Sequence, residues 1–125
     1  MKSNSSAWLA QPNYQIDITP VNKRIVIKID NQIILDSQNA LLLSEQGHHA
    51  VYYFPASDIK MAYLEKISKE TFCPFKGSAR HWSLLFNNRT IEIAAWSYEQ
   101  PFEQVKSIKD YIAFYPAVMK NAILY

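Results

Sequence analysis

A single cysteine and a lysine lie three residues apart in the segment Cys73-Pro74-Phe75-Lys76-Gly77, which has the clearest potential for chemistry in the chain. A neighbouring ammonium favours the thiolate, so Cys73 is a candidate nucleophile or redox-sensitive thiol; the alternative is a small, buried apolar side chain. Lys76 is a candidate point charge for a phosphate or carboxylate, and the alternative is a solvated turn lysine. Because Pro74 restricts the backbone and Gly77 permits a positive φ, this turn would hold Lys76 rigidly.

Glu45 is the acidic residue with the clearest need for a partner, because it ends an apolar run. It is either half of a structural ion pair with Arg24 or Lys76, or a general base with a raised pKa. The candidate catalytic residues are therefore Cys73, Lys76 and Glu45, and the sequence leaves open whether any reaction is catalysed. We expect the Lys76 amine to face Trp96, with Glu45 or Arg24 nearby.

Aromatic side chains supply the expected wall of a binding cleft. Tyr52 and Tyr53 are adjacent on an extended run, so only one of them can face the core. Trp96 shares one strand face with Tyr98 and small residues, which leaves room for a ligand. The candidate ligand-binding residues are Lys76, Arg24, Tyr52, Trp96 and Tyr98.

Several classes of site are excluded by residue counts. The only glycines, Gly47 and Gly77, are too far apart for a dinucleotide fingerprint, a phosphate-binding Walker loop or a nucleophile elbow. One cysteine excludes an internal disulfide and any Cys-x-x-Cys site. His48 and His49 point to opposite sides of an extended chain and lack further ligands, so we expect no metal and no cofactor.

Overall composition indicates an ordinary globular protein. The chain has 125 residues, a net charge of +2 and 49% hydrophobic residues, and we expect one domain over 1–125 with a polar arm at 1–13, anchored by Trp8, and a core at roughly 14–117. The cations are scattered among acids, which disfavours nucleic acid as a partner. With no signal peptide or membrane span apparent, a free cysteine predicts a cytoplasmic location. We expect a monomer or homodimer that binds a small molecule and has no membrane partner.

Alternating hydrophobicity predicts a chain made mainly of strands. Asp30-Asn31 and Asn87-Asn88 suit hairpin turns, because these residue types tolerate positive φ. Ile33 and Leu35 are expected to face the core. Trp82 is also expected to face the core, which puts its neighbour His81 on the opposite face of the same strand. The pattern predicts strands over 24–29, 32–37, 40–45, 51–54, 81–86, 90–98 and 111–115, with a helical turn as the alternative at 40–45. It also predicts a short helix from 57 or 58 to 64 and a clear helix over 102–108.

Four segments in this order resemble the bacterial family called domain of unknown function 427: Val51-Tyr52-Tyr53-Phe54-Pro55 with Asp58, Cys73-Pro74-Phe75-Lys76-Gly77, Ala95-Trp96-Ser97-Tyr98 with Pro101, and Tyr111-Ile112-Ala113-Phe114-Tyr115. The resemblance covers about residues 8 to 117, although the family usually has Tyr at Phe75 and His81 and Gly at Asp110. It implies a β-tent fold, in which two antiparallel sheets enclose a cleft. The family is sometimes labelled a nucleotidyltransferase, but Gly77-Ser78 is followed by Glu92 alone rather than paired carboxylates.

The fold expected is mainly β, an antiparallel, β-tent-like domain of two sheets with one short helix near the C-terminus. The function expected is binding of a small anionic or nucleotide-like ligand in a cleft lined by aromatic residues and Lys76. The alternative is a non-catalytic module that binds a protein or peptide through exposed aromatic side chains.

Overall fold

Ten strands form two antiparallel sheets in residues 5–125, the part of the chain that this computed structural model describes. The larger sheet has the order β1-β4-β5-β9-β8-β7-β6, and the smaller has the order β10-β2-β3. The expected mainly-β fold of two sheets is thus confirmed. The strands are β1 (Ile16–Pro20), β2 (Ile25–Ile29), β3 (Gln32–Ser37), β4 (Leu41–Glu45), β5 (Val51–Pro55), β6 (Leu64–Cys73), β7 (Gly77–Phe86), β8 (Arg89–Tyr98), β9 (Tyr111–Phe114) and β10 (Ala122–Leu124).

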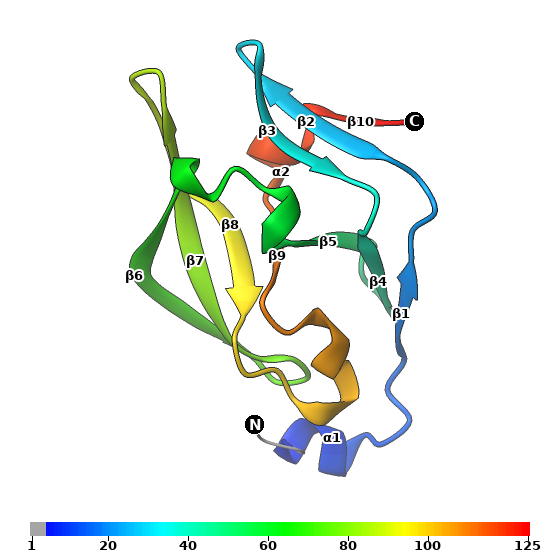
Figure 1. Cartoon of the computed structure of the whole chain (residues 1–125). Coiled ribbons are helices and arrows are strands. Elements are labelled where there is room, and N and C mark those ends of the chain that lie inside the picture. Colours follow the sequence, from blue (N-terminus) through cyan, green and yellow to red (C-terminus); the bar gives the residue numbers. More distant parts are fainter. Residues whose placement is uncertain (1–4) are drawn as a thin grey trace.

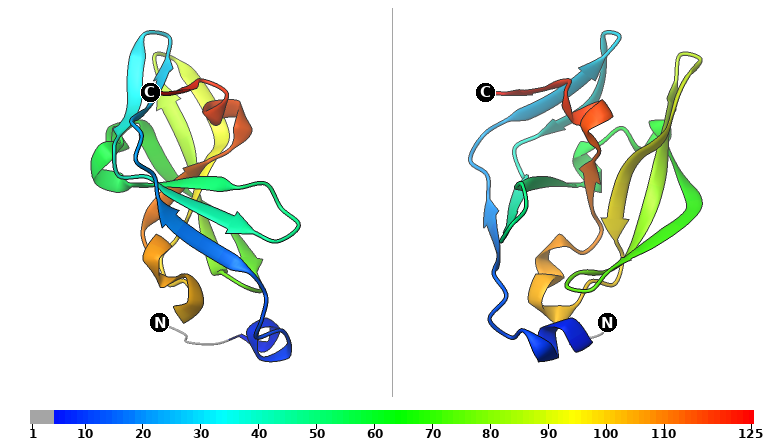
Figure 2. Two further views of the ribbon diagram at one scale, coloured as in Figure 1. Left: turned by 90° about the vertical axis from the view of Figure 1, so that its right-hand side faces the viewer. Right: turned by 180° about the vertical axis from the view of Figure 1, so that it is seen from behind.

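The larger sheet bends, so that its two edges lie on opposite sides of the molecule. Figure 1 shows β6, β7 and β8 on one side, β1 and β4 on the other, and the smaller sheet across one end. The β2–β3 and β7–β8 hairpins point the same way (Figure 2), and an ion pair of 2.7 Å between Asp30 and Arg89 links their turns. Because both side chains are about half exposed, this contact contributes little to stability.

The hairpin turns form as the sequence predicts. Asp30 and Asn31 have φ values of 49° and 64°, and Asn87 and Asn88 have values of 48° and 60°. Positive φ at both central residues gives a turn whose twist matches the twist of the flanking strands. These two turns fix the registers of β2 on β3 and of β7 on β8.

The main hydrophobic core joins the two sheets. Ile27 and Leu35 of the smaller sheet pack in the same buried cluster as Phe54, Ile112 and Phe114 of the larger one. A second cluster lies at the other end, where the turns of η3 (Glu103–Ile108) cover part of the sheet. The remaining short elements are α1 (Ser6–Ala10), η1 (Ala56–Asp58), η2 (Met61–Tyr63) and α2 (Pro116–Met119).

The helix expected over 102–108 is instead a pair of 3₁₀ turns, interrupted where Val105 leaves helical φ/ψ. Phe102, Val105 and Ile108 are all buried, as the pattern requires. Their spacing of three residues matches the three residues per turn of a 3₁₀ helix better than the 3.6 of an α-helix. The expected helix ending at Leu64 is likewise replaced by η1 and η2.

Bulges change which side chains face the core. The β2–β3 register shifts between Ile27 and Lys28, so Ile34 and Leu35 are both buried. Ile33 is 39% exposed, so the prediction that it faces the core was wrong. The β7–β8 register shifts between Trp82 and Leu84, which lets His81 be buried on one side of the shift and Leu84 on the other. Three strands were not expected at all: β1, β6, and β10, which extends the smaller sheet beyond residue 117.

Candidate functional site

A buried ion pair joins the turn between β6 and β7 to the end of β4. Lys76 Nζ lies 2.6 Å from Glu45 Oε1, and the two side chains are only 11% and 9% exposed. The other carboxylate oxygen of Glu45 accepts a hydrogen bond of 2.6 Å from the Tyr14 hydroxyl. The expectation that Glu45 or Arg24 lies beside Lys76 is confirmed for Glu45.

Both of these contacts favour the ionised form of Glu45. Burial raises the pKa of the Glu45 carboxyl, but the hydrogen bonds from Lys76 and Tyr14 outweigh burial, so this pKa lies below its usual value. The hydrogen bond between Tyr14 and Glu45, together with burial and the charge of Glu45, raises the pKa of Tyr14 to about 12. At neutral pH the Glu45 carboxyl is therefore ionised and the Tyr14 phenol is neutral.

The segment before β1 packs over the same turn. The Trp8 indole donates a hydrogen bond of 2.8 Å to the Phe75 carbonyl, and the ring of Tyr14 stacks on the ring of Phe75 with 3.7 Å between centroids. Ser5 donates a second hydrogen bond, of 2.6 Å, to the Pro74 carbonyl. Trp8, the predicted anchor of this segment, is buried. Tyr14 was not predicted as a site residue, because its position two residues after Pro12 gives no periodic signal. These contacts tie the segment before β1 to the Lys76 turn.

Cys73 is a free, partly buried cysteine that packs against the second hydrophobic cluster, which includes Tyr53 and Tyr98. Burial raises the pKa of both tyrosines, and the nearby acidic groups Cys73 and Glu45 raise it further. Tyr98, expected at the wall of a cleft, is therefore a core residue. Glu45, Lys76 and Cys73 lie in one neighbourhood beneath the second cluster.

Tyr52 and Trp96 line a different space, a cavity of about 480 Å³ that we call the Trp96 cavity. Apolar side chains from β5, β8, β9 and α2 make up most of its wall, and Lys76 is not among its lining residues. The Trp96 indole is held from behind, since its Nε1 donates a hydrogen bond of 3.2 Å to the Tyr53 hydroxyl. The lining includes His49, Tyr52, Trp96, Phe114, Met119 and Lys120.

Arg24 directly precedes β2 of the smaller sheet and lies away from the other candidates. It forms two hydrogen bonds, of 2.8 and 2.7 Å, with the Asp36 carboxylate, and its guanidinium lies over the Tyr125 ring. The bond to Asp36 raises the pKa of Arg24, and the bond to Arg24 lowers the pKa of Asp36. The structure therefore does not bring Arg24 together with Lys76.

His81 forms a polar chain that sequence reasoning missed. Its Nε2 lies 2.9 Å from the Thr71 hydroxyl and its Nδ1 lies 3.2 Å from the Tyr115 hydroxyl, while the Tyr115 ring packs on Trp96. Burial, assisted by the charge of Lys69, lowers the pKa of His81. The alternation about Trp82 placed His81 opposite the core, but His81 is buried, just before the point where extra residues of β8 shift its register against β7.

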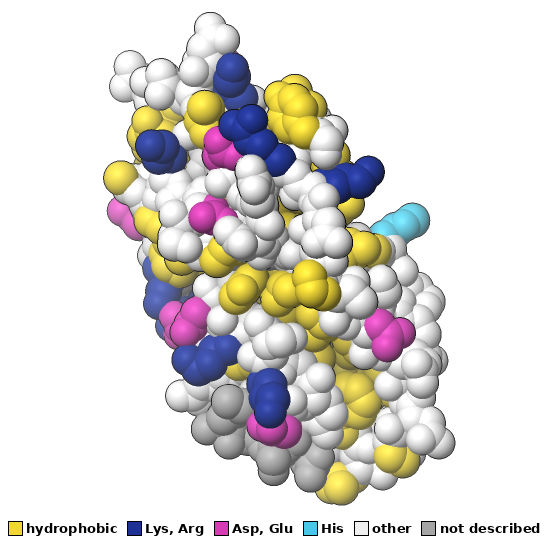
Figure 3. Space-filling model, turned by 45° about the vertical axis from the view of Figure 1, so that its right-hand side comes forward, with side chains coloured by type: hydrophobic (Ala, Val, Ile, Leu, Met, Phe, Trp, Pro, Cys, Tyr) yellow, Lys and Arg dark blue, Asp and Glu magenta, His cyan; other side chains and the backbone are white. Residues whose placement is uncertain are grey.

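Charged side chains of both signs are interspersed over the face shown in Figure 3. Among the described residues, no three His, Cys, Asp or Glu side chains are grouped to hold a metal ion. In residues 5–125 no helix has both the length and the apolar character needed to cross a membrane.

A comparison of the chain with curated proteins gives no match. A comparison with family models matches residues 17–124, which include the Glu45–Lys76 pair and the Trp96 cavity. The matching model, NTP_transf_9, describes the domain of unknown function DUF427, and the chain belongs to this family.

Proposed function

We propose that the protein binds a small anionic molecule with a flat, apolar or aromatic part in the Trp96 cavity. The observation that carries this proposal is an aromatic-lined cavity of about 480 Å³ with a lysine, Lys120, at its edge. Small-molecule sites commonly combine an apolar wall with a few polar groups that orient the ligand. Nucleotides are the first ligands to test, since the name of the family model points to nucleoside triphosphates.

The two ends of the cavity suit the two ends of such a ligand. Trp96 and Tyr52 offer aromatic surfaces for a ring, and Trp96 is braced by the Tyr53 hydroxyl and the Tyr115 ring. Lys120 is exposed, and its ammonium has no ion-pair or hydrogen-bond partner in residues 5–125. A phosphate or carboxylate at the cavity edge would gain a charge-assisted contact without breaking an existing one.

Lys76 takes a positioning role in this proposal rather than direct contact with the ligand. Its ammonium is already bound by Glu45, whose charge acts on buried Tyr53. Tyr53 in turn accepts the hydrogen bond from the Trp96 indole. The family segment that contains Lys76 would thus support the wall of the cavity from behind.

We place the protein in the reducing cytoplasm, because its cysteine is free.

Tryptophan fluorescence tests the proposal directly. In a variant with Trp8→Phe and Trp82→Phe, Trp96 is the only indole, and AMP, adenosine, 4-hydroxybenzoate and inorganic phosphate can each be titrated against it. We expect the aromatic anions to quench the fluorescence, adenosine to bind more weakly than AMP, and phosphate alone to have little effect. Lys120→Gln should weaken AMP binding about tenfold, as loss of one ion pair implies.

Lys28→Gln is the matched control, because Lys28 is an exposed lysine on the smaller sheet, outside the cavity. It should leave the affinity for AMP unchanged. Absence of quenching by every aromatic anion, or equal binding of AMP by the Lys120→Gln variant and its parent, would overturn the proposal.

A further inference from the structure

A second cavity, of about 230 Å³, lies between the β6–β7 hairpin and the loop that follows β8; we call it the Arg80 pocket. Its shape depends on Gly77, because a Cβ there would lie 3.3 Å from the Gln100 carbonyl oxygen. The Phe102 amide also donates a hydrogen bond of 3.0 Å to the Lys76 carbonyl, which ties the loop to the hairpin. The pocket is therefore framed by fixed backbone.

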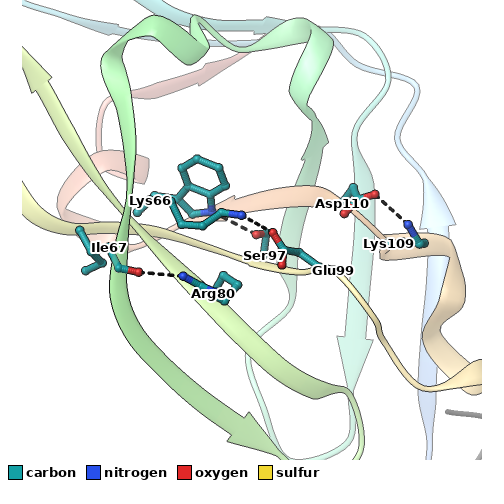
Figure 4. Close-up of polar contacts among 8 residues, drawn as sticks. Lys66, Ile67, Arg80, Ser97, Glu99, Lys109 and Asp110 are labelled. Atoms are coloured by element: carbon teal, nitrogen blue, oxygen red, sulfur yellow. Dashed lines mark hydrogen bonds and ion pairs between the residues drawn. The ribbon is translucent and has the colours of Figure 1, made fainter. Parts of the chain in front are cut away.

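Arg80 is poorly satisfied in this pocket. Its Nη2 makes a long hydrogen bond of 3.3 Å to the Ile67 carbonyl (Figure 4), and its Nε–H is buried without any partner. No other buried side-chain nitrogen or oxygen in the described part of the chain is left without a partner. A guanidinium has five N–H donors, and an unmet buried donor costs about 1–3 kcal/mol. This deficit is the feature of the pocket that most needs an explanation.

Two carboxylates line the same pocket and differ in their pairing. Glu99 forms an ion pair with Lys66 (Figure 4), so its charge is compensated. Glu70 stands directly opposite Arg80 on the neighbouring strand, yet the two form no ion pair, and Glu70 has no other partner in residues 5–125. Opposite charges at such positions usually meet. The pocket thus offers one cation and one anion that are both free to bind something else.

An apolar surface completes the pocket. Phe72 is 62% exposed and meets the edge of Phe102, with 6.2 Å between ring centroids. We propose that the Arg80 pocket binds a free α-amino acid with an apolar side chain. The carboxylate of the ligand pairs with Arg80, the ammonium pairs with Glu70, and the side chain packs on Phe72 and Phe102.

The energetics favour a zwitterion over a simple anion. A carboxylate can accept charge-assisted hydrogen bonds from the Arg80 guanidinium in place of the long bond from Nη2 to the Ile67 carbonyl. A turn of the Arg80 side chain on binding would bring the buried Nε–H to the same carboxylate and make the contact bidentate. A simple anion would meet uncompensated repulsion from Glu70, whereas an ammonium on the same ligand turns that repulsion into attraction. The volume equals that of about eight water molecules, which suits a ligand with about as many non-hydrogen atoms, such as valine or leucine.

Titration of ¹⁵N-labelled protein with L-leucine, followed by NMR, tests this proposal. We expect leucine to shift the amide signals of Gly77, Ser78 and Gln100 and to move the Arg80 Nε–H signal downfield. L-Leucinamide, which lacks the carboxylate, should leave the Arg80 signal unmoved. N-acetyl-L-leucine, which lacks the ammonium, should bind at least tenfold more weakly than leucine.

Glu70→Gln gives the decisive variant, because Glu70 is exposed and its replacement should leave the fold intact. It should weaken leucine binding about tenfold and, because the repulsion from Glu70 is gone, strengthen the weak binding of N-acetyl-L-leucine. Glu65→Gln, on the same strand but outside the pocket, should bind leucine as the wild type does. The proposal is overturned if leucine at millimolar concentration shifts no signals near Arg80, or if Glu70→Gln and wild type bind it equally.

Discussion

Loss of one partner of the buried Lys76–Glu45 pair should destabilise the protein more than loss of both. Lys76→Met leaves the Glu45 carboxylate buried beside Tyr14 without its counter-charge, and we expect a loss of about 3 kcal/mol in the free energy of unfolding. The double variant Lys76→Met/Glu45→Leu removes the stranded charge and should recover part of this loss. Urea denaturation at pH 7 measures both, and equal stability of the two variants would show that the carboxylate is well solvated.

His81 should make the stability of the protein depend on pH near neutrality. Burial lowers the pKa of His81 in the folded state, whereas its pKa in the unfolded chain is about 6.5. The unfolded chain therefore binds the extra proton first, so the stabilisation is fully present above pH 6.5 and falls as the pH drops toward the folded pKa. Thr71 and Tyr115, which face the ring, are neutral, and the facing charge of Lys69 acts in the same direction.

Urea denaturation at pH 7.5 and pH 5.5 checks this expectation. The wild type should lose stability between these values, and His81→Gln should lose clearly less. His49→Gln is the control, because His49 is exposed and should leave the pH dependence unchanged. A similar pH dependence for wild type and His81→Gln would mean that His81 is readily protonated in the folded state.

Residue types and local spacing predicted one contact of the candidate site, the pair of Lys76 and Glu45. Lys76 and Glu45 stood out because a rigid turn and the end of an apolar run each leave a charge that needs a partner. Tyr14 and His81 did not stand out, because a neutral side chain carries no charge that demands a partner and local spacing does not show their contacts with Glu45 and Tyr115. Such contacts depend on how the sheet bends, which one-dimensional periodicity does not contain.

Among the turns, the two glycines should respond very differently to alanine. Gly77 has φ of 118° and a Cβ there would press on the Gln100 carbonyl, whereas Gly47 has φ of 74° and open space around it. We expect Gly77→Ala to lower the free energy of unfolding by about 2–3 kcal/mol and Gly47→Ala by about 1 kcal/mol. Thermal and urea denaturation compare them, and an equal loss at both positions would contradict the close approach described at Gly77.

Elements with strong local signals were the ones that could be predicted. The Asp30-Asn31 and Asn87-Asn88 turns specify hairpins because few residue types tolerate two successive positive φ values. β6 gave no comparable signal, since most of its residues are exposed and charged residues fall on both of its faces. A strand of this kind is defined by pairing with β7 rather than by burial, and pairing is a long-range property.

On the scale of the whole molecule, the shared core should make the two sheets a single cooperative unit. Ile27 of β2 is fully buried in the cluster that also holds Phe54, Ile112 and Phe114 of the larger sheet. Neither sheet can therefore open without exposing apolar surface of the other. Native-state hydrogen exchange should show the same opening free energy for the protected amides of β2 and of β9.

Ile27→Ala provides the sharpest form of this prediction. Deleting a fully buried isoleucine costs about 2–5 kcal/mol, and the opening free energy should fall by the same amount in β2 and in β9, although the substitution lies only in the smaller sheet. Ile123→Ala in β10 is the control, because Ile123 is 55% exposed and its loss should change exchange in neither sheet appreciably. If Ile27→Ala lowers protection in β2 and β3 while β9 keeps its wild-type value, the smaller sheet unfolds as a separate unit. A shared fall would instead mean that any ligand that stabilises the Trp96 cavity on the larger sheet also protects the β2–β3 hairpin, because both belong to one transition.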